Sequence, residues 1–157
     1  MAERRGSPRK PPTEPRLQNT VRLSAEGLAK VLGDLEARVL RSVWQLGRPA
    51  PARAVHALVA EDHPVAFLTV VTVLNKLVVK GILAREKRED LLHYEARQSE
   101  AEFTALASRR LVEGILSLSS EAITASFVDV LAEQDPEQFE RLARLVRRRK
   151  RSKDGRE

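Results

Sequence analysis

Residues 66–81 read AFLTVVTVLNKLVVKG and predict an amphipathic helix that ends at Gly81. The inward stripe consists of Leu74, Leu77 and Val78, with Val70 or Val71. The other side presents Thr69, Thr72 and Asn75, and then Lys76. A solvated helix face in a chain that is 32% charged should carry mostly Glu, Lys and Arg. Short polar side chains are therefore unusual on this face, and the flanking segments explain them.

Two predicted helices precede this segment and a predicted hairpin follows it. Residues 32–47, LGDLEARVLRSVWQLG, have helical spacing and end at Gly47 and Pro49, and residues 51–62 form a second helix with Pro51 in its first turn. Residues 82–97 predict two strands with Glu89-Asp90 at the tip, although the turn lacks the Asn-Gly or Asp-Gly pair typical of tight hairpins. Three helices followed by a charged hairpin is the order of a winged helix-turn-helix.

This order explains the polar face of residues 66–81. In a winged helix the third helix enters the major groove, about 12 Å wide, where short side chains allow close approach to base edges. The expected DNA-contacting residues are Thr69, Thr72, Asn75 and Lys76 on the helix, and Arg85, Lys87 and Arg88 at the hairpin tip. The alternative is that Thr69 and Thr72 are ordinary surface threonines.

The second half of the chain predicts three more helices. Ser99 and Glu102 form a capping box for the first, the second starts near Ser119 or Ser120, and Asp135 caps the third. About 55 residues are too few for a comfortable separate core, so these apolar stripes predict a two-fold dimer, although packing on the first domain as a monomer remains open. The expected dimerisation residues are Phe103, Leu111, Ile115, Ile123, Phe127, Val130, Leu131, Phe139 and Leu142.

The fold class expected is mainly α with a small β-hairpin, a winged helix-turn-helix domain followed by a helical dimerisation domain. The expected boundaries are a disordered basic arm over 1–27, the DNA-binding domain over 28–98, the dimerisation domain over 99–148 and a basic flexible tail over 149–157. The arm is either an extension without a role or a segment that reaches DNA.

The composition of the chain excludes several classes of function. The net charge of +6 suits a polyanion partner or simple solubility. The absence of cysteine excludes disulfides and thiolate chemistry, and no stretch approaches the ~18 apolar residues of a membrane span. His56, His63 and His93 lack metal-ligand spacing, and no catalytic motif is present. We therefore expect a cytoplasmic protein that is not an enzyme and has no cofactor, metal or membrane partner.

Three quoted segments, LGDLEARVLRSVW, FLTVVTVLNKLVVKGIL and HYEA, resemble the penicillinase-repressor family of bacterial transcription factors. The resemblance covers roughly residues 32–146 and implies a winged helix, a helical dimerisation domain and repression from palindromic operators. It implies that Thr69 and Thr72 touch DNA and that Lys76 stands where the family often has a base-contacting Arg. Leu68 replaces the usual Thr or Lys at another DNA-contacting position.

The same resemblance suggests two ways in which such a repressor could be inactivated. Family repressors of the β-lactam pathway are inactivated by a protease at an Asn-Phe bond, and the matching bond here is Ser126-Phe127, where the Asn is missing. Copper-responsive relatives use C-terminal cysteines, which this chain lacks. The sequence therefore predicts a homodimeric repressor of double-stranded DNA operators, with an inactivating protease left open. The alternatives are a nucleoid-type, non-specific DNA-binding protein and a winged-helix module that binds protein.

Overall fold

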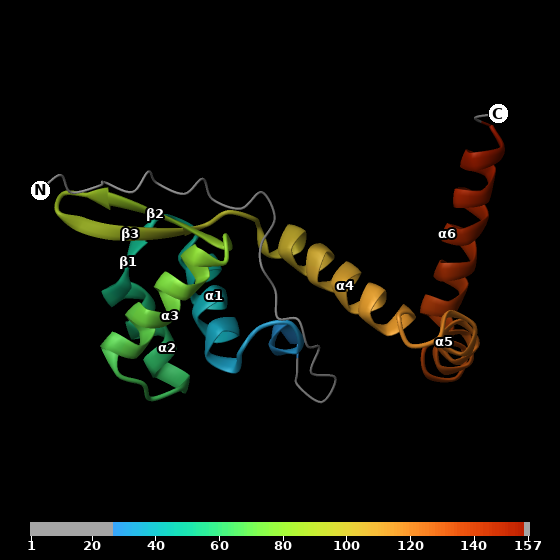
Figure 1. The fold of residues 1–157 in the computed structure, drawn as a ribbon, viewed down its shortest axis with the longest axis horizontal. Coiled ribbons are helices and arrows are strands. Elements are labelled where there is room, and N and C mark those ends of the chain that lie inside the picture. Colours follow the sequence, from blue (N-terminus) through green and yellow to red (C-terminus); the bar gives the residue numbers. More distant parts are fainter. Residues whose placement is uncertain (1–26, 156–157) are drawn as a thin grey trace, which may run out of the picture. The chain divides into compact units, whose positions relative to one another are not determined.

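The computed structural model describes residues 27–155, so the predicted basic arm lies outside the described residues except for Gly27. Figure 1 shows the elements in chain order. They are η1 (Gly27–Lys30), α1 (Asp34–Leu46), β1 (Ala50–Pro51), α2 (Ala52–Asp62), α3 (Phe67–Val79), β2 (Leu83–Arg88), β3 (Leu91–Ala96), α4 (Glu100–Leu116), α5 (Ser120–Gln134) and α6 (Pro136–Asp154). The predicted class, mainly α with a small β-hairpin, is confirmed.

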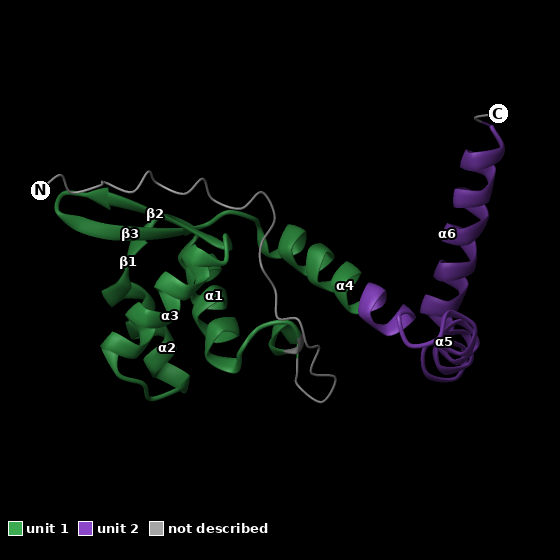
Figure 2. Ribbon diagram, viewed as in Figure 1, with its two compact units in different colours: residues 1–111 green, residues 112–157 purple. Residues whose placement is uncertain are grey.

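The chain divides into two compact units, residues 1–111 and residues 112–157, called unit 1 and unit 2 below (Figure 2). Unit 1 holds the winged-helix elements, and α4 begins in unit 1 and continues into unit 2. The functional boundary expected between residues 98 and 99 stays a prediction.

The core of unit 1 is aliphatic and is built where α1, α2 and α3 meet. Each helix contributes the side chains of its apolar stripe, and Leu83 of β2, Tyr94 of β3 and Ile82 just before β2 complete the core. The fully buried side chains include Val39, Leu40, Val55, Val70, Leu74, Leu77, Ile82, Leu83 and Tyr94. Burying one such aliphatic side chain stabilises the fold by about 1.5–3 kcal/mol, so this core holds α3 firmly in place.

The sheet has three antiparallel strands in the order β1-β3-β2. The predicted hairpin is confirmed, with Leu83 opposite Ala96 and Arg88 opposite Leu91. Its two turn residues, Glu89 and Asp90, have φ of 48° and 64°, the positive values that a tight hairpin turn requires. The pairing of the short β1 with β3 was not expected from the sequence.

Several predicted helix ends are confirmed, whereas Pro51, predicted in the first turn of α2, is the N-cap residue before that helix and belongs to β1. Gly47 and Gly81 adopt positive φ beyond α1 and α3, where a side chain would strain the backbone. The backbone N–H and hydroxyl of Ser99 donate to Glu102 Oε2 at 2.8 and 2.9 Å, and these bonds lower the pKa of Glu102. Asp135 Oδ1 accepts from the N–H of Gln138, with Pro136 in the first turn of α6.

The start of α4 packs into unit 1. Phe103 is fully buried there, and its ring centroid lies 5.6 Å from that of Trp44. Trp44 Nε1 donates to the Gln98 carbonyl oxygen at 2.9 Å. Phe103 therefore fills the core of its own chain and, contrary to the expectation from the sequence, is not available to contact a partner. Leu111 is partly buried against the same core.

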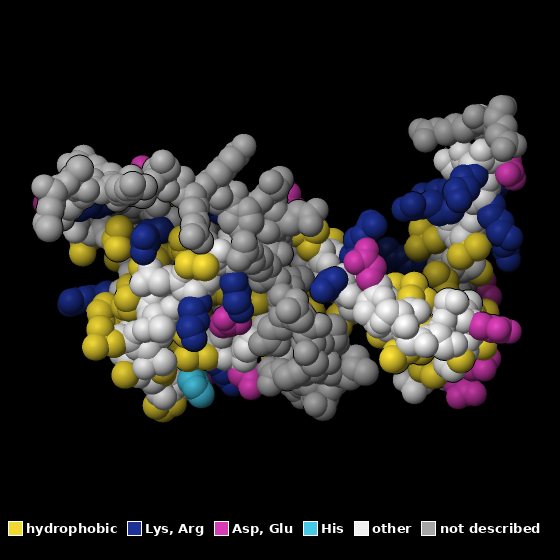
Figure 3. Space-filling model, in the orientation of Figure 1, with side chains coloured by type: hydrophobic (Ala, Val, Ile, Leu, Met, Phe, Trp, Pro, Cys, Tyr) yellow, Lys and Arg dark blue, Asp and Glu magenta, His cyan; other side chains and the backbone are white. Residues whose placement is uncertain are grey.

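Unit 2 has no comparable core among its described residues. The helices α5 and α6 pack against each other, yet neither contains a buried residue. Figure 3 shows hydrophobic side chains exposed over both helices. The large exposed hydrophobic side chains of unit 2 are Val112, Leu116, Leu118, Phe127, Val128, Val130, Leu145 and Val146.

The sequence predicts a flexible tail from residue 149, whereas α6 continues through Asp154. Arg and Lys are good helix formers, and their charges interact favourably with the carboxyl end of a helix. No single helix between residues 27 and 155 is long and apolar enough to cross a membrane; α2 and α3 meet those criteria only as a pair bent by 113°.

Candidate nucleic-acid interface

The third helix presents two unlike faces, as its sequence predicts, although Val73 is buried and the predicted Val78 is only partly buried. Its buried stripe consists of Val70, Val73, Leu74 and Leu77. The exposed side holds Leu68, Thr69, Thr72, Lys76 and Val79. Leu68 and Val79 are 74% and 70% exposed, so an apolar side chain stands at each end of this face. A shallow groove runs along it, lined by Thr72, Asn75, Lys76, Val79 and Lys80.

The hydroxyl group of Thr72 donates a hydrogen bond within α3. Its Oγ1 donates to the Leu68 carbonyl oxygen four residues earlier, at 2.9 Å. This bond fixes the rotamer of Thr72. The groups left for a ligand are the methyl group and the acceptor lone pairs of Oγ1. Thr72 can therefore touch a thymine methyl or accept from an adenine or cytosine amino group, but it cannot donate a hydrogen bond without rotating.

Asn75 links the helix to the hairpin. Its Oδ1 accepts from the Arg85 guanidinium at 2.8 Å and from the Tyr94 hydroxyl at 3.1 Å. Arg85 is the third residue of β2, directly opposite Tyr94, rather than a residue of the hairpin tip. Asn75, which the sequence predicts to contact bases, therefore holds Arg85 beside α3. Only the amide N–H groups of Asn75 remain to bind DNA.

Asn75→Ala should destabilise the protein by about 1–3 kcal/mol, because the Tyr94 hydroxyl, on a residue only 1% exposed, loses its acceptor. Urea unfolding at pH 7 measures the change. Arg85→Ala is the matched control: it removes one donor to the same oxygen but leaves Tyr94 paired, so we expect less than about 1 kcal/mol. Equal losses in the two variants would contradict the role assigned to Asn75.

The hairpin from Arg85 through its turn has no net charge. Residues 85–90, REKRED, contain three cations and three acids. Lys87 Nζ lies 3.1 Å from Asp90 Oδ1, and Arg88 Nη2 lies 2.9 Å from Glu86 Oε2. Such exposed ion pairs are worth about 1 kcal/mol or less and exchange readily, so Lys87 and Arg88 can still turn to a phosphate. They offer DNA a smaller net charge than the sequence suggested.

A part-buried ion pair joins α1 to the end of α3. Lys80 Nζ donates to Glu36 Oε1 at 2.7 Å, and the Gly33 N–H donates to Glu36 Oε2 at 3.0 Å. Burial by itself would raise the pKa of Glu36, but the hydrogen bonds and charge of Lys80 and the N–H of Gly33 outweigh it and lower the pKa below its ordinary 4.5. Glu36 thereby caps α1 and fixes the carboxyl end of α3.

Glu36→Gln should lower the free energy of unfolding at pH 7 by about 1–3 kcal/mol, because Lys80 keeps its charge without an anion partner. A carboxyl whose folded pKa is lowered stabilises the fold at pH values above its unfolded pKa. That contribution disappears as the pH falls through the folded pKa. The difference between the wild-type and variant chains in urea titrations should therefore shrink on acidification below pH 4.5. A constant difference would contradict this prediction.

The three histidines lie in unit 1, where the rings of His56 and His93 lie close to backbone carbonyl oxygens. His56 Nε2 lies 2.8 Å from the Val65 carbonyl oxygen, and its ring meets that of Phe67 edge-on, with centroids 5.7 Å apart. His56 thus braces the turn between α2 and α3. His93 lies on β3, with Nδ1 3.3 Å from the Leu91 carbonyl oxygen, and His63 ends α2. Among the described residues no group of three or more His, Cys, Asp or Glu side chains could hold a metal ion.

The residues expected to contact a partner differ in the exposure of their side chains. Phe127 and Val130 are 55% and 50% exposed on α5. Partly buried side chains are Leu111, Ile115, Ile123, Leu131, Phe139 and Leu142. The Ser126-Phe127 bond lies in the middle of α5, so a protease could reach an extended backbone there only after local unwinding.

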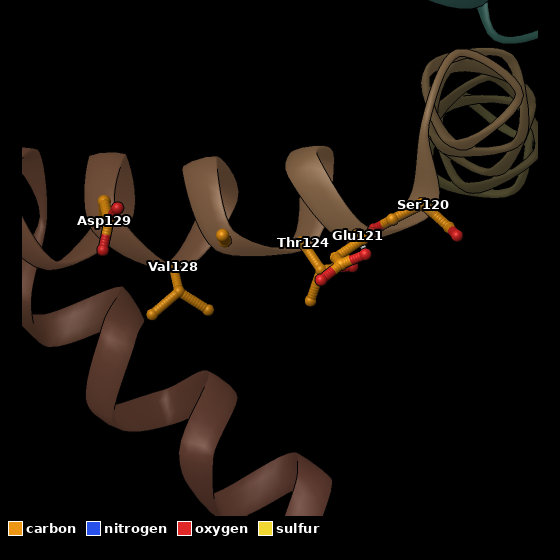
Figure 4. Close-up of a pocket in the computed structure, with 6 residues that line it drawn as sticks. Ser120, Glu121, Thr124, Val128 and Asp129 are labelled. Atoms are coloured by element: carbon orange, nitrogen blue, oxygen red, sulfur yellow. Dashed lines mark hydrogen bonds between the residues drawn. The ribbon is translucent and has the colours of Figure 1, made fainter.

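The surface of α5 also has a shallow depression. Figure 4 shows Ser120, Glu121, Thr124, Val128 and Asp129 along this side, and all its lining residues belong to α5. Thr124 Oγ1 donates to the Ser120 carbonyl oxygen at 2.5 Å, so the threonine is engaged within the helix. A depression lined by one helix has no wall to enclose a small molecule.

Known proteins similar to this chain include members of a repressor family. A family model described as "Penicillinase repressor" matches residues 32–148. Two curated relatives, each called "Transcriptional regulator BlaI", come from Mycobacterium tuberculosis strains CDC 1551 / Oshkosh and ATCC 25618 / H37Rv. Each is 36% identical over 62 residues, which are 40% of this chain and 44% of the relative. The chain thus spans less than half the length of these relatives.

Proposed function

This chain belongs to the penicillinase repressor family, whose model matches residues 32–148, and we propose that it is a DNA-binding transcriptional repressor. The observation that supports this most is the exposed face of α3. It holds short polar side chains opposite a buried stripe and is followed by a hairpin, the arrangement of a helix that enters the major groove. The bacterial cytoplasm, where the DNA lies, is the compartment that this function requires.

In this proposal Thr69, Thr72 and Lys76 meet base edges, and Leu68 stands at the start of the same face. Lys76 can reach a guanine edge or a phosphate, because its side chain is exposed late on the helix. Arg85, held by Asn75, contacts a phosphate beside α3, and Lys87 and Arg88 contact backbone after leaving their acid partners.

We propose further that the chain acts as a homodimer on a palindromic operator. The apolar side chains of unit 2 support the dimer, because two helices without a buried residue gain little stability from each other alone. A two-fold partner would cover Phe127 and Val130 and would present two α3 helices to two half-sites. The contact surface proposed consists of Leu111, Ile115, Ile123, Phe127, Val130, Leu131, Phe139 and Leu142.

One observation favours a second candidate. Leu68 and Val79 place apolar side chains at both ends of the exposed face of α3, as a helix that binds protein would. A third candidate is a non-specific DNA-coating protein. Competition binding separates the three. A repressor should prefer its palindrome over random duplex by about 10³-fold or more, a coating protein should bind both equally with a steep salt dependence, and a protein-binding module should bind neither.

A further inference from the structure

The last two turns of α6 are densely basic. Residues 147–153, called the basic end of α6 here, contain six cations, namely Arg147, Arg148, Arg149, Lys150, Arg151 and Lys153. All six side chains are exposed, and Figure 3 shows the Lys and Arg side chains gathered over the end of this helix. Their charge equals the formal net charge of the whole chain, +6.

The two halves of α6 differ in their electrostatics. In the first half, Arg141 and Arg144 each follow an acid by four residues, Glu137 and Glu140, a spacing that stabilises a helix. In the basic end, the residue four before Arg148 is Arg144, and the residue four before Arg151 is Arg147. Each such pair of like charges destabilises the helix by about 0.2–0.5 kcal/mol. The basic end therefore holds a helical form that an anion would stabilise.

The basic end is unsuited to a protein interface. Successive residues of a helix are turned by about 100°, so six cations among seven residues surround the helix axis. No side of this segment can be buried without burying a cation, and the ion pairs found among residues 27–155 include none of the six. The apolar stripe ends at Val146, so a partner that covers the stripe leaves the basic end in solvent.

The charge density of the basic end matches that of duplex DNA. Seven residues extend about 10.5 Å at 1.5 Å per residue, which gives about one cation per 1.8 Å of helix axis. Duplex DNA carries about one phosphate per 1.7 Å. We propose that the basic end of α6 is a DNA-contacting surface in addition to α3 and the hairpin, and that it binds backbone phosphates without reading sequence. The proposal rests on the DNA binding proposed above.

The test compares two double variants of the full chain. Arg148→Gln/Arg151→Gln removes two charges from the basic end, and Arg141→Gln/Arg144→Gln removes two from the first half. The two pairs have the same spacing and are seven residues apart, so they lie on nearly the same side of the helix. Glutamine is also a good helix former, so both variants should keep α6.

The measurement is affinity for a random duplex and for the selected palindrome between 50 and 200 mM salt. Arg148→Gln/Arg151→Gln should lower the slope of log affinity against log salt by about 1.8 per protomer, so wild type loses about tenfold more affinity per protomer over this range. Preference for the palindrome should change less than about twofold. Arg141→Gln/Arg144→Gln should leave the slope within about 0.5.

Equal slopes for the two double variants would overturn the proposal. So would a change confined to binding of vesicles that contain anionic lipid, because the basic end would then serve a membrane surface. Neither result would contradict the proposal that the chain is a repressor. That proposal fails only if the wild-type chain shows no preference for any duplex sequence.

Discussion

Phe127→Glu should convert the chain from a dimer to a monomer and lower its affinity for a palindromic operator by about 10²–10⁴-fold. Phe127 is 55% exposed on α5, beside Val130 at 50%, in a unit whose helices bury no residue of their own. A carboxylate there would be buried without a cation if a second copy covered this surface. The loss in affinity follows because the second half-site then has to be bound from solution.

The matched control is Ala132→Glu. Ala132 is exposed on the same helix, about 140° around the axis from Phe127, and alanine to glutamate keeps a good helix former. Size-exclusion chromatography with light scattering should give a dimer for wild type and Ala132→Glu, and a monomer for Phe127→Glu. A dimeric Phe127→Glu, or a monomeric wild type, would contradict the proposed interface.

Thr72→Ala should lower the preference of the dimer for its operator by about 15-fold while leaving affinity for random duplex within about twofold. The Thr72 hydroxyl donates to the Leu68 carbonyl oxygen, so the methyl group is the part best placed to meet a thymine methyl. A buried methyl group is worth about 0.8 kcal/mol, and two half-sites double that.

Two further substitutions separate the methyl group from the hydroxyl. Thr72→Val keeps the methyl and should retain the preference within about threefold, whereas Thr72→Ser keeps the hydroxyl and should behave like Thr72→Ala. Competition between the palindrome and random duplex measures all three variants. If Thr72→Val is as poor as Thr72→Ala, Oγ1 is the reading atom; if affinity for both duplexes falls equally, α3 is not the recognition helix.

Local patterns in the sequence were sufficient to predict most elements. Apolar spacing predicted α1, α2 and α3, and two apolar segments on either side of a charged tip predicted the hairpin. The capping residues Ser99, Glu102 and Asp135 predicted where α4 and α6 begin, because each makes its hydrogen bonds within three residues. Interactions of this range are encoded in the spacing itself.

Interactions between distant residues could not be predicted in this way. Phe103 lies at an apolar position that suits either an interface or the core, and only the approach of α4 to Trp44 decides between them. The bonds from Arg85 and Tyr94 to Asn75 depend on how α3 meets the sheet. The ion pair between Glu36 and Lys80 joins two of the three segments that carry the family resemblance.

We propose that α3 reads a DNA sequence within a two-fold dimer. Selection from a randomised duplex library with the purified full chain tests this proposal. We expect enrichment of a palindrome whose half-sites are about one or two helical turns apart, and weaker enrichment of the same palindrome in Thr72→Ala. Recovery of bound duplexes with no shared sequence, or no recovery of DNA at all, would contradict it.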